Sequence, residues 1–172
     1  VNVAELLSRA QRIAENNSIE IARNNYAAHI GAVMGGLARE GVDKLTFFTS
    51  PLLANFGDWA EQLIAESTGK DGKGILPVVG EMIASSEHYG DDRLFVYIKT
   101  SDDETYDIAI QALKEARRPV MTLCVGGKYD LGGQFFLWEM ATAIAGHVLG
   151  IQPYNQPNVE SAKILARAKI DD

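Results

Sequence analysis

The sequence predicts an α/β fold, a three-layer αβα sandwich around a doubly wound parallel sheet of four to five strands. Short apolar runs of strand length alternate with longer segments whose apolar residues recur at helical spacing. The run Leu-Phe-Val-Tyr-Ile at 94–98 is apolar at every position, as expected of a central parallel strand that is buried on both faces. Strands that alternate with helices in this way form parallel sheets with right-handed crossovers.

The first third of the chain predicts two helices and then a strand. Apolar residues at helical spacing indicate helices over 3–15 and from about 18 to 39. Three glycines in the second helix predict close packing against a neighbour; they are Gly31, Gly35 and Gly36. Short apolar or β-branched runs give the expected strands, at 44–49, 75–79, 93–99 and 119–125.

Local start signals place the remaining helices. Ser50-Pro51 combines an N-cap with a proline at the first helical position, so we expect a helix to about Ala65 and a loop over 66–73. The acidic stretch Ser101-Asp-Asp-Glu104 has the pattern of a capping box that opens a helix to about 117, which explains it better than a metal site does. The last two helices are expected at 134–149, apolar almost all round, and from about Pro157.

Size and composition favour one globular domain over residues 1–172, with no repeat or linker. A net charge of −7 argues against a nucleic acid or an anionic membrane as partner, and no apolar run has the length of a membrane span. The single cysteine, Cys124, lies in an apolar run, so we expect a core residue and a reducing, cytoplasmic location. The chain starts at Val1, which suggests a fragment or a processed protein.

Two distant segments are expected to meet at the amino edge of the sheet. The helix after the first strand returns the chain to this edge near Glu66, and the helix ending near Leu149 returns the 150–157 turn there. Gln156 and Lys163 are seven positions apart, so both can face one side of the last helix and suit a polyhydroxylated anion. The alternative is a proline-initiated helix in which Lys163 pairs with Glu160.

Two blocks of the sequence resemble segments of one known family. The first is Gly146-x-Val148-Leu149-x4-Tyr154-Asn155-Gln156-x-Asn158-Val159-Glu160-x2-Lys163, which is similar to the C-terminal signature of the glucose-6-phosphate isomerase family. That signature has Gly or Ala where this chain has Asn158. The second is Gln62-Leu-Ile-Ala-Glu66-Ser67-Thr68-Gly69-Lys70, which resembles the segment that carries the catalytic glutamate. The amino-acid sequence of segments 44–50, 74–81 and 89–98 is most similar to that of bacterial transaldolase/glucose-6-phosphate isomerase fusion proteins.

The resemblance implies a sugar-isomerase (SIS) domain that interconverts glucose 6-phosphate and fructose 6-phosphate without a metal or another cofactor. It implies that Glu66 moves a proton between C2 and C1 through a cis-enediol(ate) and that Lys163 assists as a catalytic cation. Gln156, Ser67 and Thr68 are the substrate-binding residues that it suggests.

Parts of the family's site have no counterpart in this sequence. They are the phosphate-binding loop of a preceding SIS domain, a Gly-Gly-Arg segment and the ring-opening histidine, for which His88 is nearest by order but lacks the surrounding motif. We therefore expect a homodimeric protein with a preceding SIS domain, and poor or no isomerisation by this chain alone.

Two other functions stay open on the sequence. One is a non-catalytic sugar-phosphate-binding SIS module in which Glu66 is dispensable. The other is a flavodoxin-like module with its ligand at the carboxyl edge, near Thr49-Ser50 or Thr100-Ser101. The stretch 69–74 is rich in glycine and lysine, but it precedes a strand rather than a helix and is a weak phosphate signal.

Overall fold

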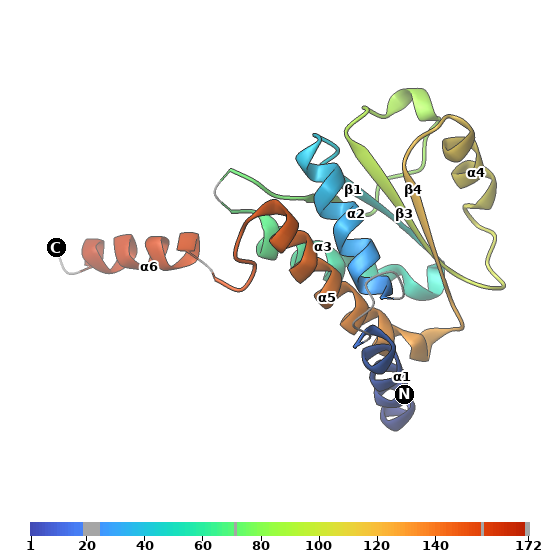
Figure 1. Cartoon of the computed structure of the whole chain (residues 1–172), viewed down its shortest axis with the longest axis horizontal. Helices are drawn as coiled ribbons and strands as arrows, with labels where there is room; N and C mark the ends of the chain where they lie inside the picture. The colour runs from blue at the N-terminus through green and yellow to red at the C-terminus, as the bar shows by residue number, and fades with distance from the viewer. Residues whose placement is uncertain (19–24, 71, 156, 171–172) are drawn as a thin grey trace.

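The computed structural model describes residues 1–18, 25–70, 72–155 and 157–170. It confirms the α/β class: a parallel sheet lies between helices in three layers (Figure 1). The helices are α1 (Val3–Asn17), α2 (Tyr26–Arg39), α3 (Ala54–Thr68), α4 (Asp107–Glu115), α5 (Leu131–Leu149) and α6 (Pro157–Ile170). The strands are β1 (Lys44–Thr49), β2 (Leu76–Val78), β3 (Arg93–Thr100) and β4 (Val120–Val125). Short 3₁₀ turns lie at η2 (Pro51–Leu53), η3 (Ser86–His88) and η4 (Lys128–Asp130).

The sheet has the order β2-β1-β3-β4, and all neighbouring strands run parallel. Lys44 at the start of β1 is in register with Leu76 of β2 and with Arg93 of β3. The long strand β3 lies in the interior of the sheet, and its positions 94–98 are all buried, as the apolar run predicted. Four of the expected four to five strands are present in the described residues.

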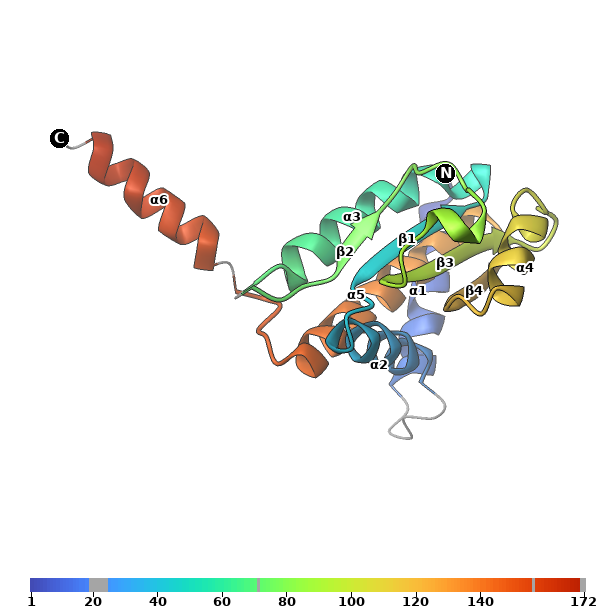
Figure 2. The same cartoon turned by 90° about the horizontal axis from the view of Figure 1, so that it is seen from above.

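The larger part of the core lies on one face of the sheet, beneath α2, α3 and α5. Trp138 of α5 is fully buried, and its ring lies 5.1 Å from that of Phe47 of β1, between centroids. On α3, Phe56, Ala60 and Ile64 recur at helical spacing and are buried in the same cluster. This packing fixes how α3 and α5 lie relative to each other and to the sheet (Figure 2).

The opposite face has a thinner cover, formed by the short helix α4 and the segment around Tyr89. Cys124 faces this side on the edge strand β4, and it is exposed, so the prediction of a core cysteine is wrong. The apolar run around it suggested burial on both faces. However, an edge strand that is covered by one nine-residue helix leaves part of its surface in contact with solvent.

Several helix boundaries differ from the prediction. Helix α4 begins at Asp107 rather than at 101 and has no side-chain cap, so the capping box predicted for 101–104 does not open it. Within that stretch, the Asp103 carboxylate is bonded elsewhere. It accepts a hydrogen bond from the Ser50 hydroxyl across the sheet edge, and this bond lowers the pKa of Asp103. Helix α3 continues to Thr68, so Glu66 is helical and not part of a loop. The second helix begins at Tyr26, and part of its predicted start lies outside the described residues.

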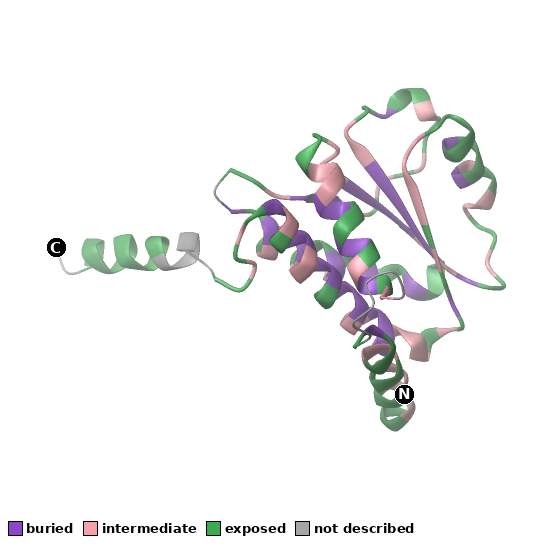
Figure 3. Cartoon of the chain, viewed as in Figure 1, coloured by how far each residue is buried: buried purple, intermediate pink, exposed green. Residues whose placement is uncertain are grey.

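The C-terminal helix α6 projects from the rest of the chain in both views (Figures 1 and 2). Its side chains from Ser161 to Ile170 are exposed (Figure 3). Ile164 and Leu165 are among them, at 57% and 69% exposure. The predicted helix from Pro157 is therefore present, but in this chain it has an open surface that includes apolar side chains.

The glycines of α2 divide into two kinds. A Cβ on Gly31 would lie 2.7 Å from the Ile144 Cβ of α5, and one on Gly35 would lie 2.7 Å from the Val148 Cβ. A Cβ on Gly36 would meet nothing within 4 Å. Close helix–helix approach therefore explains Gly31 and Gly35, as the sequence predicted, but not Gly36.

We predict opposite effects for the same substitution at two of these glycines. Gly31→Ala should lower the free energy of unfolding by about 1–3 kcal/mol, because the new methyl group has no space between α2 and α5. Gly36→Ala should raise it by about 0.5–1 kcal/mol through better helix propensity. Urea denaturation of both variants tests this, and equal effects at the two sites would contradict the packing described.

Candidate functional site

Glu66 lies in the last turn of α3, on an exposed part of the helix. The Gln62 side-chain amide, one turn earlier, donates a hydrogen bond to Glu66 Oε1 at 3.1 Å. This contact uses the i, i+4 spacing of the helix and holds the carboxylate along the helix surface. Glu66 is thus oriented by its own helix.

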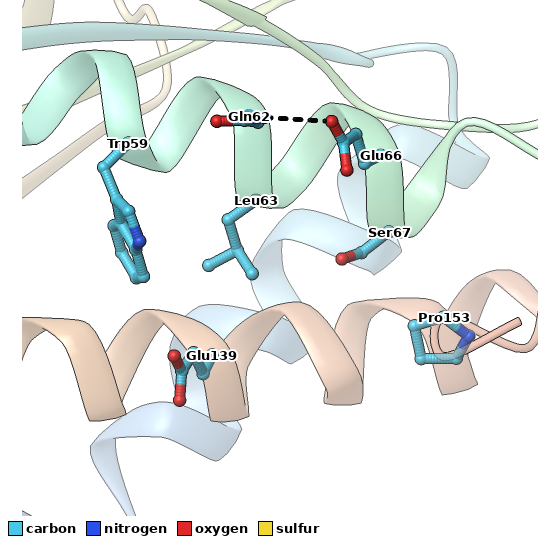
Figure 4. A pocket seen from close by; sticks show the side chains of 7 residues that line it. All are labelled: Trp59, Gln62, Leu63, Glu66, Ser67, Glu139 and Pro153. Atoms are coloured by element: carbon cyan, nitrogen blue, oxygen red, sulfur yellow. Dashed lines mark hydrogen bonds between the residues drawn. The ribbon is translucent and has the colours of Figure 1, made fainter. Parts of the chain in front are cut away.

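A pocket of about 220 Å³ lies beside this turn, between α3 and α5 (Figure 4). Its lining residues come from three segments: Trp59, Gln62, Leu63, Glu66 and Ser67 of α3, Glu139 of α5, and Pro153 of the turn after α5. The structure therefore brings the end of α3 and the turn after α5 to one place, as predicted from the order of strands and helices.

The predicted C-terminal contributions are not assembled in this pocket. Gln156 lies outside the described residues. Lys163 is exposed on α6, which projects from the body of the chain and does not bring Lys163 to Glu66. Of the predicted pair of catalytic residues, only Glu66 lines the pocket.

Ser67 and Thr68 are neighbours with different surroundings. Ser67 is half-buried and lines the pocket. Thr68 is fully buried; its hydroxyl donates to the Ile64 carbonyl at 2.8 Å and accepts from the Ile75 amide at 2.9 Å. Thr68 therefore joins the end of α3 to the segment that enters β2, and its predicted contact with substrate stays a prediction.

Glu139 lines the pocket and was not predicted from the sequence. It is the only acidic residue of α5, a helix that is apolar over most of its length, and its carboxylate lies across the gap from α3 (Figure 4). A single carboxylate in such a helix could have been recognised from the sequence, because a charged residue there indicates a position that faces away from the core. Trp59 of α3 packs against the core cluster and also lines the pocket.

The pocket is acidic. Glu66 and Glu139 both line it, and none of the lining residues that the structure describes is a lysine or an arginine. An anionic ligand would be repelled here unless a cation came from another segment or another chain. The lining of this pocket therefore does not by itself suit an anionic ligand.

An apolar groove continues from this pocket along α5. It has a volume of about 400 Å³ and shares Leu63, Ser67, Glu139 and Pro153 with the pocket, and it adds Phe136, Met140, Thr142, Ala143 and Tyr154. The Thr142 hydroxyl is buried and has no hydrogen-bond partner in the described structure. This groove is open at the surface that faces the start of the α6 connection.

His88 and the carboxyl edge of the sheet give less support for a site. His88 lies in η3 next to Tyr89, and Tyr89 packs on the sheet face opposite to α3. The Nδ1 atom of His88 lies 2.7 Å from the Ser85 hydroxyl. At the carboxyl edge, the Ser50 hydroxyl donates to Asp103 and accepts from the Thr100 amide at 3.0 Å. The polar groups of that edge therefore bind each other.

No group of three or more metal-ligating side chains gathers within the described ranges. No helix in the same part of the chain is long and apolar enough to cross a membrane.

Comparison with known proteins adds independent information. No protein-family model matches the chain. The glucose-6-phosphate isomerase of Lactobacillus gasseri is 32% identical over 151 aligned positions, which cover 66% of this chain and 34% of that protein. The enzyme of the same name from Pediococcus pentosaceus is 25% identical over 201 positions, covering 94% of this chain and 45% of that protein.

The chain is similar to glucose-6-phosphate isomerases. These relatives support an isomerase family for it, although the chain spans only 34% to 45% of their length.

Two solved structures share the fold. A hypothetical protein from Thermus thermophilus matches with a TM-score of 0.77 at 17% identity, over 100% of this chain and 51% of that one. A glucose-6-phosphate isomerase from Chlamydia trachomatis matches with a TM-score of 0.68 at 16% identity, over 97% and 42%. At these identities the two structures show the fold alone.

We predict that Thr68 and Ser67 differ in their importance for stability. Thr68→Val should lower the free energy of unfolding by about 1–3 kcal/mol, because the Ile75 amide would be buried without an acceptor. Ser67→Ala, its neighbour on the pocket side, should change it by less than about 0.5 kcal/mol. Thermal and urea unfolding of the two variants measure the difference, and a stable Thr68→Val variant would contradict the structural role.

Proposed function

We propose that this chain is a single SIS domain, the C-terminal part of a glucose-6-phosphate isomerase, of the kind that bacteria also fuse to transaldolase. The observation that carries the proposal is the pocket shared by Glu66, Ser67 and Pro153. It joins the segment that resembles the family's catalytic block to a turn within the segment that resembles its C-terminal signature. The similarity to named isomerases supports the same assignment.

In the proposed reaction, the Glu66 carboxylate takes the proton from C2 of open-chain glucose 6-phosphate. It returns the proton to C1 of the cis-enediol(ate), while a second proton passes from the C2 hydroxyl to O1, which gives fructose 6-phosphate. One carboxylate can serve both carbons because they are adjacent and present their protons on one side. Gln62 orients the base through its hydrogen bond, and the Ser67 hydroxyl binds a sugar hydroxyl.

The acidic pocket requires a cation before it can hold a dianionic sugar phosphate. We propose that α6 turns back over the apolar groove in the complete protein, with Ile164 and Leu165 against Leu63 and Met140. Both sets of side chains offer apolar surface: the groove lining is mostly apolar, and the two α6 residues are exposed in this chain. This movement brings Lys163 and Gln156 to Glu66.

The remaining parts of the site come from outside this chain in the proposed protein. A preceding SIS domain supplies the phosphate-binding loop, and a second subunit of a homodimer closes the site. This chain alone is then a weak or inactive isomerase. The protein acts in the cytoplasm, where its sugar-phosphate substrates occur.

Glu66→Gln, made in the protein that includes the preceding domain, tests the proposed base. It should lower kcat by about 10²–10⁴-fold, since the amide cannot accept the proton. Glu139→Gln is the matched control, because it neutralises the other carboxylate of the pocket, and it should lower kcat by less than about tenfold. Exchange of the C2 proton of the substrate with deuterated water, followed by NMR, measures the step itself.

The same variants separate the alternatives. If Glu66→Gln keeps its turnover within about tenfold, Glu66 is not the general base. If the unmodified protein binds 6-phosphogluconate but exchanges no C2 proton, the chain is instead a non-catalytic sugar-phosphate-binding module.

A further inference from the structure

Lys70 is a buried charge next to the proposed site, with only 5% of its surface exposed. Its ammonium group donates hydrogen bonds to the Gln152 carbonyl at 3.0 Å and to the Pro153 carbonyl at 2.7 Å. Lys70 follows Glu66 by four positions, whereas its acceptors lie 82 and 83 positions further along the chain. One side chain therefore joins the end of α3 to the turn between α5 and α6.

Backbone hydrogen bonds hold Lys70 at the end of α3. The Lys70 amide donates to the Thr68 carbonyl at 2.8 Å, and Lys70 and Lys73 exchange backbone hydrogen bonds of 3.1 and 2.9 Å. Thr68 is in turn bonded to Ile64 and Ile75 through its buried hydroxyl. Pro153 packs against Gly146 and the Ile151 amide donates to the Gly146 carbonyl, which hold the turn to α5, whereas the two bonds of the Lys70 ammonium hold it to the end of α3.

Stability alone does not account for this lysine. An ammonium group loses favourable hydration when it is buried, and a carboxylate partner usually compensates for that loss. Within the part of the chain that the structure describes, no carboxylate forms an ion pair with Lys70, and its ammonium donates to backbone carbonyls instead. A methionine of similar length would fill the space without burying a charge.

We propose that Lys70 is a positioning residue for the isomerisation. It holds residues 152–153 against the Glu66 end of α3, and so sets where Gln156 and Lys163 meet the substrate. This inference rests on the proposed function, since it needs both residues to act on the substrate that Glu66 deprotonates.

Lys73 provides a matched control on the same loop. Its ammonium also donates to a carbonyl, that of Leu149 at 3.0 Å. However, Lys73 is exposed, and its acceptor belongs to the end of α5 rather than to the turn that lines the pocket. Loss of this contact should leave the turn in place.

The kinetic test compares Lys70→Met, Lys70→Arg and Lys73→Met in the protein that includes the preceding domain. Lys70→Met should lower kcat/KM by about 10–100-fold, because small misplacements of reacting groups have effects of this size. Its thermal midpoint should stay unchanged or rise, which a purely structural role would not allow. Lys70→Arg should restore most of the activity, and Lys73→Met should stay within about twofold of the unmodified protein.

A double-mutant cycle tests whether Lys70 acts through the C-terminal segment. In a Lys163→Ala background, Lys70→Met should change kcat/KM by less than about twofold, because the group that it positions is already gone. Additive losses from the two substitutions would overturn the inference.

Hydrogen–deuterium exchange of this chain tests the connection without any activity. Amides in 150–155 should exchange about tenfold faster in Lys70→Met, but not in Lys73→Met. Unchanged exchange overturns the inference, as does full activity of Lys70→Met. Faster exchange in a protein that shows no isomerase activity even when unmodified supports the connection and overturns the proposed function.

Discussion

The parallel direction of the four strands is the constraint on which the rest of this structure depends. A helix that leaves the carboxyl end of one strand must return the chain to the amino end before a neighbouring parallel strand can begin. Helices α3 and α5 both cover the same face of the sheet and both end at that edge. The pocket beside Glu66 forms where these two returning helices and the turn after α5 meet.

Tight packing turns this topology into a defined geometry. Gly31 and Gly35 let α2 approach α5 closely, and Trp138 anchors α5 on the sheet. The Thr68 hydroxyl donates to the Ile64 carbonyl at the end of α3. The Lys70 ammonium donates to the carbonyls of the turn at 152–153 and so joins that turn to the end of α3. Because most of these contacts are buried, the framework of the pocket does not depend on its exposed carboxylates.

The charge of the pocket lining is the next feature of the site. Glu66 and Glu139 give it negative charge, whereas Lys163, the cation that we propose for the substrate, is exposed on α6. A helix with exposed Ile164 and Leu165 gains little by remaining in solvent. The same chain thus contains a well-packed body and a C-terminal helix, α6, with exposed apolar side chains.

The sequence by itself determined the fold class, all four strands to within one or two residues at each end, and the meeting of two distant segments at one edge. Periodicity and the direction of parallel strands are enough for these conclusions, because each depends on local pattern and chain connectivity. Tertiary structure decided the rest. The stretch 101–104 forms no capping box, and its Asp103 carboxylate accepts from Ser50 at the sheet edge. Cys124 is exposed because β4 is an edge strand. Glu139 and the Lys70 ammonium reach the turn region through packing between segments far apart in sequence, and no local pattern encodes which carbonyl or carboxylate will lie beside them.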